Sequence, residues 1–354
     1  MRETTQKNIR EAADHFDFDG KPVSFQSNRS GHINDTVIVT SENDGSSRRY
    51  ILQRINTDIF SRPEELMENI VHVTTFLKDK IRSAGGDPER ETLTVVPAGD
   101  GSPLYRDGDG SCWRAYFFIE DTVCYDRPDQ PERFGQSGAI FGRFQRMLSD
   151  YPAESLHETI ADFHNTEVRF RNFMSAVSKD CMHRAGEVER EIRFLEDRRD
   201  YTRILQGTSM PLRVLHNDTK LSNVLFDQKS GKPLCVIDLD TIMPGYVITD
   251  FGDAVRFGAS TAAEDERDLT RVHFDRTLYN LFRDSFLQES GGALTDEEVR
   301  MLPDGAKLLT YEQALRFLGD YLAGDVYYHT ERPGQNLDRA RTQIRLLKEM
   351  ERIL

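Results

Sequence analysis

The chain has little of what a membrane protein or an exported protein needs. No apolar stretch approaches the ~20 residues that a membrane-spanning helix requires, and residues 1–7 lack the apolar core of a signal peptide. The four cysteines show neither a Cys-x-x-Cys motif nor the spacing of a zinc finger. We therefore expect a cytoplasmic protein with reduced thiols and no cysteine-based metal site.

Positive charge is also scarce, with 46 Lys and Arg residues against 60 Asp and Glu residues, a net charge of −14. Such a chain repels nucleic acid and anionic membrane surfaces, so we expect neither as a partner. Nothing in the composition indicates an oligomeric state. The 354 residues exceed the ~250–300 at which a single hydrophobic core stops growing, and 38% of them are hydrophobic, so we expect two lobes.

The most informative segment has the form His-x-Asp-x-x-x-x-Asn, made by His216, Asp218 and Asn223, with Asp238 fifteen residues further on. Phosphoryl transfer asks a protein mainly for positioning and charge neutralisation. In kinases the first Asp orients the acceptor hydroxyl and takes its proton, while the Asn and a later Asp hold Mg²⁺ against the phosphates. We therefore predict Asp218 as the catalytic base, Asn223 and Asp238 as Mg²⁺ ligands, and ATP as the phosphoryl donor.

The segment between the two predicted metal ligands has the pattern of a β-hairpin. Residues 223–227 and 234–238 are rich in apolar side chains and flank a turn-forming stretch at 228–233. Folding the hairpin brings Asn223 and Asp238 to the same end. If the second strand continues, Asp240 shares a face with Asp238, as a ligand of a second metal or as a supporting carboxylate.

Residues 250–252 spell the Asp-Phe-Gly that supplies a metal ligand in protein kinases, but their position argues against that role. Asp250 follows a Met-Pro-Gly break at 243–245 and does not end the hairpin strand. We predict instead that Asp250 and Asp253 form hydrogen bonds within their lobe and cap a helix through 254–257.

The order of the remaining elements is that of a two-lobe kinase. Apolar residues at helical spacing predict a helix over 63–82, and the later part of the chain is largely helical. The predicted class is α+β, with a nucleotide-binding, antiparallel-sheet N-lobe over 1–119 and a helical C-lobe over 120–354 for the catalytic loop and the acceptor. The predicted N-lobe strands are 24–26, 36–40, 49–54, 93–96 and 113–119.

The loop at 27–34, between the first two strands, is predicted to face the phosphates of the nucleotide. Gly31 permits a tight turn, while His32 and Asn34 offer polar contacts to phosphate oxygens. The loop has one glycine where the protein-kinase loop has three, so a plain surface hairpin is the alternative.

Three further residues are predicted to contact the nucleotide or to support such a contact. Protein kinases place a Lys on the third strand for the phosphates, but this chain has Arg54 there, which can supply the charge through a bidentate fork. Glu68 on the following helix is the expected partner of Arg54, with Glu64 and Glu65 as competitors near the helix start. A solvated charged face is the alternative to such a pair. Glu120 opens the polar break that we interpret as the hinge, where backbone groups would meet adenine.

These motifs together resemble the aminoglycoside phosphotransferase-like kinase family, and their longer wording resembles the N-acetylhexosamine 1-kinases. The resemblance rests on residues 31–36, 50–56, 216–220 and 236–245 and runs from about residue 25 to the C-terminus. It implies transfer from Mg-ATP to the anomeric hydroxyl of N-acetylglucosamine or N-acetylgalactosamine, giving the sugar 1-phosphate and ADP.

The resemblance also favours Arg316 and Tyr327 as contacts to the acceptor, because a sugar needs hydrogen-bonding and stacking groups together. An ordinary helical ion pair between Arg316 and Asp320 is the alternative to a binding role. The sequence does not distinguish the sugar epimers, and it does not show whether the N-acetyl group is required.

Two other functions remain open from the sequence. Another small-molecule kinase of the same fold, acting on an aminoglycoside, a choline-like alcohol or homoserine, would differ only in its acceptor pocket. An aminoglycoside is a polycation and would call for acidic side chains around Asp218. A nucleotide-binding module without catalysis is the second alternative, and the intact set of Asp218, Asn223 and Asp238 weighs against it.

Overall fold

The computed structural model describes residues 5–28, 33–128 and 130–354, and the chain divides into two compact units. Within the described ranges, no helix combines the length and the apolar character needed to cross a membrane. Unit 1 consists of Met1–Cys124, Asp150–Ala161 and Val224–Pro244, and unit 2 of Tyr125–Ser149, Asp162–Asn223 and Gly245–Leu354.

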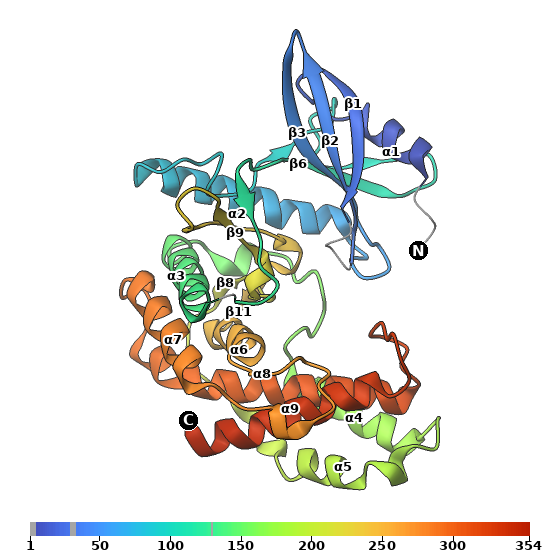
Figure 1. Cartoon of the computed structure of the whole chain (residues 1–354), viewed down its shortest axis with the longest axis vertical. Helices are drawn as coiled ribbons and strands as arrows, with labels where there is room; N and C mark the ends of the chain where they lie inside the picture. Colours follow the sequence, from blue (N-terminus) through green and yellow to red (C-terminus); the bar gives the residue numbers. More distant parts are fainter. Residues whose placement is uncertain (1–4, 29–32, 129) are drawn as a thin grey trace. The chain divides into compact units, whose positions relative to one another are not determined.

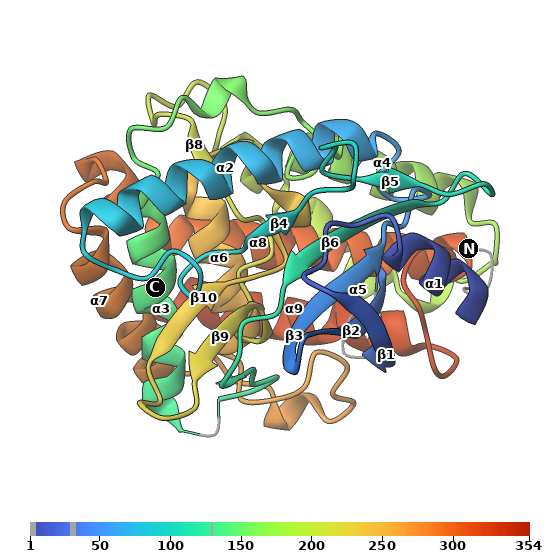
Figure 2. The same ribbon diagram turned by 90° about the horizontal axis from the view of Figure 1, so that it is seen from above.

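Unit 1 is built on an antiparallel sheet with the strand order β1-β2-β3-β6-β4, in which β5 also pairs with β6 (Figure 1). The helix α1 (Gln6–Ala13) packs on this sheet through Ile9, Ala12 and Ala13 (Figure 2). Each predicted N-lobe strand overlaps one of these strands. Their bounds are β1 Lys21–Asn28, β2 Asp35–Asn43, β3 Ser46–Arg54, β4 Val95–Val96, β5 Tyr105–Arg106 and β6 Cys112–Phe117.

The helix α2 (Pro63–Ser83) confirms the helix predicted over 63–82. It starts with Pro63, whose missing N–H and fixed φ suit the first helical turn. Asn69, which is 1% exposed, ties this helix to two other segments of unit 1. Its Nδ2 donates to the carbonyl oxygens of His157 (2.8 Å) and Ile242 (3.0 Å), and its Oδ1 accepts from the N–H of His157 (2.9 Å).

The predicted hairpin is also confirmed. The strands β9 (Val224–Asp227) and β10 (Pro233–Val236) pair antiparallel, and β7 (Thr122–Val123) adds to the other edge of β9. The chain then leaves the sheet and forms the 3₁₀ turn η5 (Leu239–Thr241). The remaining short elements here are η1 (Ala153–Ser155) and β11 (Met243–Gly245).

Unit 2 is mainly helical. The helices α3 (Pro131–Met147) and α7 (Arg276–Ser290) approach closely at Gly138 and Gly142. A Cβ at Gly138 would lie 2.4 Å from the carbonyl oxygen of Phe282, and one at Gly142 would lie 2.2 Å from that of Phe286, so only glycine allows this contact. Its longer elements are α3 Pro131–Met147, α4 Thr166–Lys179, α5 Glu189–Glu196, α6 Val247–Gly258, α7 Arg276–Ser290, α8 Asp296–Ala323 and α9 Gln335–Ile353. Its short elements are β8 Arg213–Leu215, η2 Ala185–Glu187, η3 Arg199–Arg203, η4 Leu221–Asn223 and η6 Leu269–Arg271.

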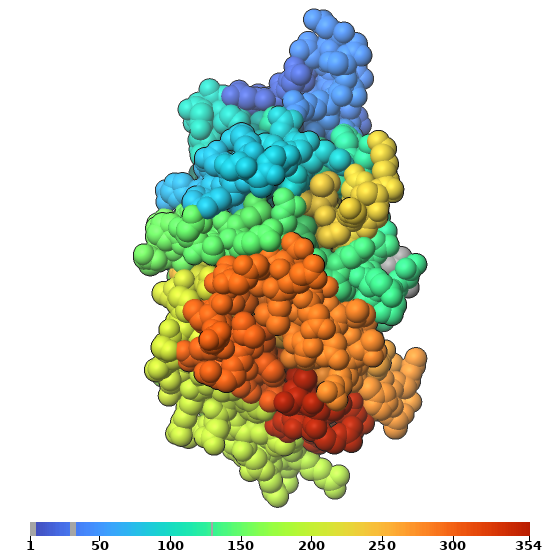
Figure 3. Space-filling model, turned by 90° about the vertical axis from the view of Figure 1, so that its left-hand side faces the viewer, coloured from blue at the N-terminus to red at the C-terminus, as the bar shows by residue number. Residues whose placement is uncertain are grey.

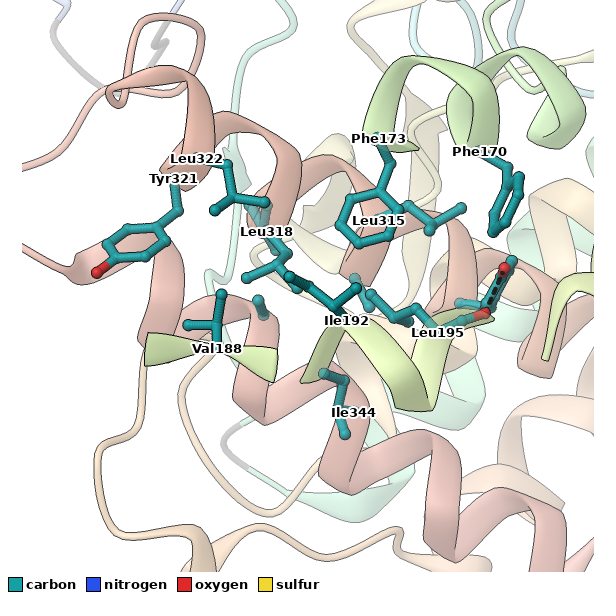
Figure 4. Close-up of a cluster of buried hydrophobic side chains, with 14 of the residues drawn as sticks. Phe170, Phe173, Val188, Ile192, Leu195, Leu315, Leu318, Tyr321, Leu322 and Ile344 are labelled. Carbon is teal, nitrogen blue, oxygen red and sulfur yellow. Dashed lines mark hydrogen bonds between the residues drawn. The ribbon is translucent and has the colours of Figure 1, made fainter. Parts of the chain in front are cut away.

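One hydrophobic core of unit 2 gathers apolar side chains from α4, α5, α8 and α9. Ile192 and Leu195 of α5 point toward Leu315 and Leu318 of α8 (Figure 4). Burying such a side chain stabilises the fold by about 1.5–3 kcal/mol, so this cluster fixes α8 in place. Residues of α7 and of the start of α8, coloured orange, form much of the face of unit 2 that Figure 3 shows.

Candidate active site

The predicted catalytic loop begins where β8 ends and is held by a buried histidine. His216 has 0% exposed surface, and its ring packs edge-on against Phe141 and Phe144 of α3, with centroids 5.7 and 6.3 Å away. The Nδ1 atom of His216 accepts a hydrogen bond from the backbone N–H of Asp218 (3.2 Å). The ring therefore fixes the backbone at the residue predicted to be the base.

Asp250 holds the same loop through two backbone hydrogen bonds. Its Oδ2 accepts from the N–H of His216 (2.8 Å) and its Oδ1 from the N–H of Asn217 (2.7 Å). Burial raises the pKa of Asp250, while His216 and the two N–H groups act in the opposite direction. Asn217 has φ 61°, a left-handed conformation that is uncommon outside glycine. Asp250 therefore stabilises an unusual backbone path.

The expectation that Asp250 caps a helix through 254–257 is wrong. The helix α6 begins earlier, at Val247, and its N-cap is Tyr246. Asp250 therefore lies in the first turn of the helix, where its carboxylate can reach the catalytic loop. Asp253, one turn further on, forms an ion pair with Arg256 (3.0 Å) within the same helix.

The side chain of Asp218 is partly open to solvent, at 31% exposure, and is placed by two neighbours. Its Oδ2 lies 2.8 Å from the Nζ of Lys220 and accepts a hydrogen bond from the Nδ2 of Asn223 (2.9 Å). Burial alone would raise the pKa of Asp218, but the charge of Lys220 and its hydrogen bond, together with Asn223, hold that pKa below its ordinary value. Asp218 is therefore ionised at neutral pH, and its Oδ1 is left to accept a hydroxyl proton.

Replacing Lys220 with methionine should move the acid limb of the pH profile of kcat/KM to higher pH. In the wild type the lowered pKa keeps Asp218 ionised, so protonation of its carboxylate should reduce activity only under the most acidic conditions. Without Lys220 the effect of burial is less opposed and the pKa of Asp218 rises. Kinetics between about pH 4 and 8 would measure the shift. The surface control Lys229→Met should leave the acid limb unchanged. An acid limb that does not shift in Lys220→Met, or that shifts equally in the control, would contradict this assignment.

Asn223 also points one of its polar atoms away from Asp218. Its Nδ2 donates to both the carbonyl oxygen (2.8 Å) and the Oδ2 (2.9 Å) of Asp218. These bonds fix the amide and leave the Oδ1 of Asn223 without a partner among the described residues. An amide oxygen is a ligand type that Mg²⁺ accepts.

In unit 1, the predicted metal ligand Asp238 lies just beyond the hairpin, in a left-handed conformation with φ 62° and ψ 59°. The strand does not continue to Asp240, because β10 ends at Val236 and Asp240 lies in the turn η5, so the condition for a shared face is not met. Non-glycine residues in this conformation concentrate at functional sites, where the surrounding structure holds them. Because of this turn, Asp240 does not share a strand face with Asp238.

Asp240 is 3% exposed and has both carboxylate oxygens engaged. Its Oδ1 lies 2.6 Å from the Nη1 of Arg114, and its Oδ2 accepts from the Nδ2 of Asn34 (2.6 Å). Asn34 also accepts from the backbone N–H of Asn56 through its Oδ1 (2.9 Å). Of the two roles open for Asp240, the structure therefore favours the supporting carboxylate over the metal ligand.

Arg114 is the residue of this site that the sequence reasoning missed. It is 1% exposed on β6, and its Nε donates to the Oε1 of Gln53 on β3 (3.0 Å). Burial acts to lower its pKa, but the charges of Asp240 and Asp238 raise it, and the net direction is upward. The sequence feature that could have indicated Arg114 is a single cation inside the apolar strand 112–117. An unpaired charge there would be costly, so such a residue predicts a buried partner of opposite charge.

The other predicted nucleotide contacts are Gly31, His32 and Arg54, with Glu68 as the expected partner of Arg54. Gly31 and His32 lie outside the described residues. Arg54, with a side chain 8% exposed, donates through its Nε to the Oδ2 of Asp35 (2.9 Å). The expected Arg54–Glu68 pair is wrong, because Glu68 instead meets the Nε2 of His157 (2.8 Å).

Glu120, the predicted hinge residue, is engaged on both its side chain and its backbone. Its Oε1 accepts from the Nε of Arg49 (2.9 Å), and its carbonyl oxygen accepts from the Nη2 of Arg90 (3.1 Å). Arg90 also pairs with Asp227 on β9 (3.1 Å). A role of Glu120 in adenine binding stays a prediction.

The two predicted acceptor contacts come together in unit 2. The guanidinium of Arg316 on α8 lies 5.8 Å from the ring of Tyr327, 5.5 Å from that of Tyr328 and 5.9 Å from that of Phe163. The helical pair of Arg316 with Asp320 does not form, because Asp320 instead accepts backbone hydrogen bonds from residues 326–328 and one from Asn336. The loop that carries Tyr327 is therefore fixed by Asp320.

Comparison with known proteins decides the family. The model of the phosphotransferase enzyme family (APH) matches residues 24–282, which is more than half of the chain. The chain belongs to this family. The predicted α+β kinase-like fold, with an antiparallel sheet in the N-terminal region and a helical C-terminal region, is confirmed.

Solved structures of similar fold include several phosphotransferases at low sequence identity. A microcompartment-associated aminopropanol kinase is 17% identical, with a TM-score of 0.60 over 97% of this chain and 95% of its own. An aminoglycoside phosphotransferase of Alicyclobacillus acidocaldarius is 13% identical, with a TM-score of 0.60 over 100% and 97%. A spectinomycin phosphotransferase in complex with ADP and spectinomycin is 13% identical, with a TM-score of 0.54 over 99% and 98%. At these identities the likeness shows the fold alone.

Unit 2 of this phosphotransferase also contains a cavity of about 350 Å³. Leu221, three residues after Asp218, lines it together with the apolar side chains of Phe134, Phe257 and Leu278. The polar part of the lining includes three carboxylates and two guanidinium groups, so it is of mixed charge. These residues are Asp126, Glu264 and Asp275, and Arg127 and Arg256.

Proposed function

We propose that this phosphotransferase transfers the γ-phosphoryl group of Mg-ATP to the anomeric hydroxyl of an N-acetylhexosamine, releasing the sugar 1-phosphate and ADP. The observation that carries this proposal is the state of Asp218. Its carboxylate is ionised, its Oδ2 is held by Lys220 and Asn223, and its Oδ1 is open. An anomeric hydroxyl is more acidic than an ordinary alcohol, so a carboxylate that orients it and accepts the proton late suffices.

Mg²⁺ suits the donor atoms that Asn223 and Asp238 offer. Both are oxygen ligands, and Mg²⁺ usually binds through one or two such groups while phosphates and water complete its octahedron. No group of three or more His, Cys, Asp or Glu side chains in the described ranges has the arrangement of a metal site. When bound, the ion neutralises charge on the phosphates, while Asp240 and Arg114 keep the turn at Asp238 in place.

The surroundings of Arg316 support a neutral, hydroxylated acceptor over a polycation. The pKa of Arg169 is lowered, first by burial and then by the charge of Arg316, while the charge of Glu312 acts in the opposite direction, so the region carries both signs of charge. This is not the purely acidic pocket that a polycationic aminoglycoside calls for. Arg316 also sits among the rings of Tyr327 and Tyr328, where a choline-like quaternary ammonium would need to stack. A sugar can instead accept hydrogen bonds from Arg316 and pack its apolar face on a ring.

A panel of acceptors tests the proposal. Purified protein with Mg-ATP should release ADP with N-acetylglucosamine or N-acetylgalactosamine at rates well above those with spectinomycin, choline or homoserine. Omitting Mg²⁺ in the presence of a chelator should abolish the release. A clear preference for choline, homoserine or an aminoglycoside would contradict the proposed acceptor but leave the kinase assignment standing.

A further inference from the structure

Gln343 of α9 is a buried amide that the fold does not use. The residue is 2% exposed and lines the cavity of unit 2. Its Oε1 is buried and has no hydrogen-bond partner among the described residues. Most buried polar atoms in native structures are hydrogen-bonded, and leaving one unpaired is costly, so this oxygen needs an explanation.

Arg256, Glu264 and Asp275 on the same walls already have hydrogen-bond partners, which sets Gln343 apart. Arg256 donates to Asp253 (3.0 and 3.2 Å) and to Glu264 (2.7 Å). Asp275 caps α7 by accepting through its Oδ1 from the N–H groups of Thr277 (2.8 Å) and Leu278 (3.0 Å). Of the two buried polar residues in the lining, Arg256 is paired, whereas Gln343 keeps an oxygen without a partner among the described residues.

The position and the lining of the cavity indicate what that ligand is. Leu221 belongs to η4, which ends at the predicted metal ligand Asn223, so the cavity extends to the catalytic loop. A bound molecule would meet Phe134 and Phe257 on its apolar walls. A buried carbonyl-type oxygen repels an anion and accepts from a hydroxyl or an amide N–H. The lining carries charges of both signs and favours neither an anion nor a cation, so an uncharged molecule suits it best.

We propose that Gln343 is a specificity-determining residue, whose Oε1 accepts a hydrogen bond from an uncharged hydroxyl or acetamido N–H of the acceptor while the apolar walls contact its carbon skeleton. The proposal rests on the proposed function, because it assigns this cavity to the acceptor of the same reaction. It assigns Gln343 no part in the transfer step, so binding of the acceptor, and not of ATP, should depend on it.

Gln343→Leu tests the proposal, since leucine removes the amide at similar size. The expected result is an increase of about three- to tenfold in the KM and in the calorimetric Kd for N-acetylglucosamine, the effect of losing one neutral hydrogen bond. The KM for ATP should not change. The Tm should stay equal or rise, because the variant no longer buries an unpaired amide.

Thr342→Val is the matched control. Thr342 is buried beside Gln343 on the same helix, but its hydroxyl already donates to the carbonyl oxygen of Asp338 (2.9 Å), and it does not line the cavity. Its replacement should leave the affinity for the acceptor unchanged.

The outcomes separate this proposal from the proposed function. If the wild type binds N-acetylglucosamine through Gln343 but phosphorylates another acceptor, the proposed function fails and the role of Gln343 stands. If Gln343→Leu binds the sugar as the wild type does, or if the wild type does not bind it, the role of Gln343 is overturned. A lowered Tm with unchanged affinity would show that the amide serves the fold alone.

Discussion

Replacing Asp218 with asparagine is expected to lower kcat by about 10²- to 10⁴-fold, the usual contribution of a positioned general base. Asparagine keeps the shape of the side chain but can neither take the hydroxyl proton nor carry the charge that pairs with Lys220 (2.8 Å). Binding of ADP should be largely unaffected, because the predicted nucleotide contacts lie elsewhere. Steady-state kinetics together with calorimetric titration of ADP would measure the two effects.

The matched control is Asp200→Asn, the same substitution at a side chain that is 94% exposed in unit 2. It should leave both kcat and nucleotide binding unchanged. A kcat for Asp218→Asn within a few-fold of the control, with an intact fold by circular dichroism, would show that another group takes the proton.

The second large effect is expected on stability, from Asp240→Asn. The change removes the charge opposite Arg114, whose side chain is 2% exposed and lies 2.6 Å from Asp240. Breaking a buried ion pair from one side typically costs about 3–5 kcal/mol, because the remaining charge is left in the protein interior. Urea unfolding, followed through the single Trp113 of unit 1, would measure the loss as a lower transition midpoint.

Asp121→Asn is the control for this variant, because its ion pair with Lys229 is exposed on both sides (56% and 81%). A surface pair of this kind is worth about 0–1 kcal/mol. The double variant Arg114→Met, Asp240→Leu should recover part of the stability lost in Asp240→Asn, since it removes both charges together. Equal effects of Asp240→Asn and Asp121→Asn would contradict the structural role given to the Arg114–Asp240 pair.

The features that the sequence predicted well are those set by short-range patterns. The hairpin at 223–238 follows from two apolar runs around a turn, and the helix over 63–82 follows from its periodicity. The family of the chain was expected from the resemblance of several short motifs to known kinases, and the family match over residues 24–282 confirms it. Each of these depends on residues that are neighbours along the chain.

The features that the sequence did not predict depend on partners far apart in the chain. Arg114 and Asp240 are separated by 126 positions, and the sequence around either residue does not indicate that the other is its partner. Glu68 meets His157 instead of Arg54 for the same reason. The left-handed turn at Asp238 ended the strand before Asp240, which a period-two pattern cannot indicate.

We propose that the ionised Asp218 directs the phosphoryl group to the anomeric hydroxyl of an N-acetylhexosamine. The most direct measurement compares N-acetylglucosamine with its borohydride-reduced alditol, which lacks the anomeric centre, in the presence of Mg-ATP. Phosphorus NMR of the product from the sugar should show a phosphate coupled to the anomeric proton, and the alditol should give no product. A phosphate on another carbon, or turnover of the alditol at a comparable rate, would contradict the account.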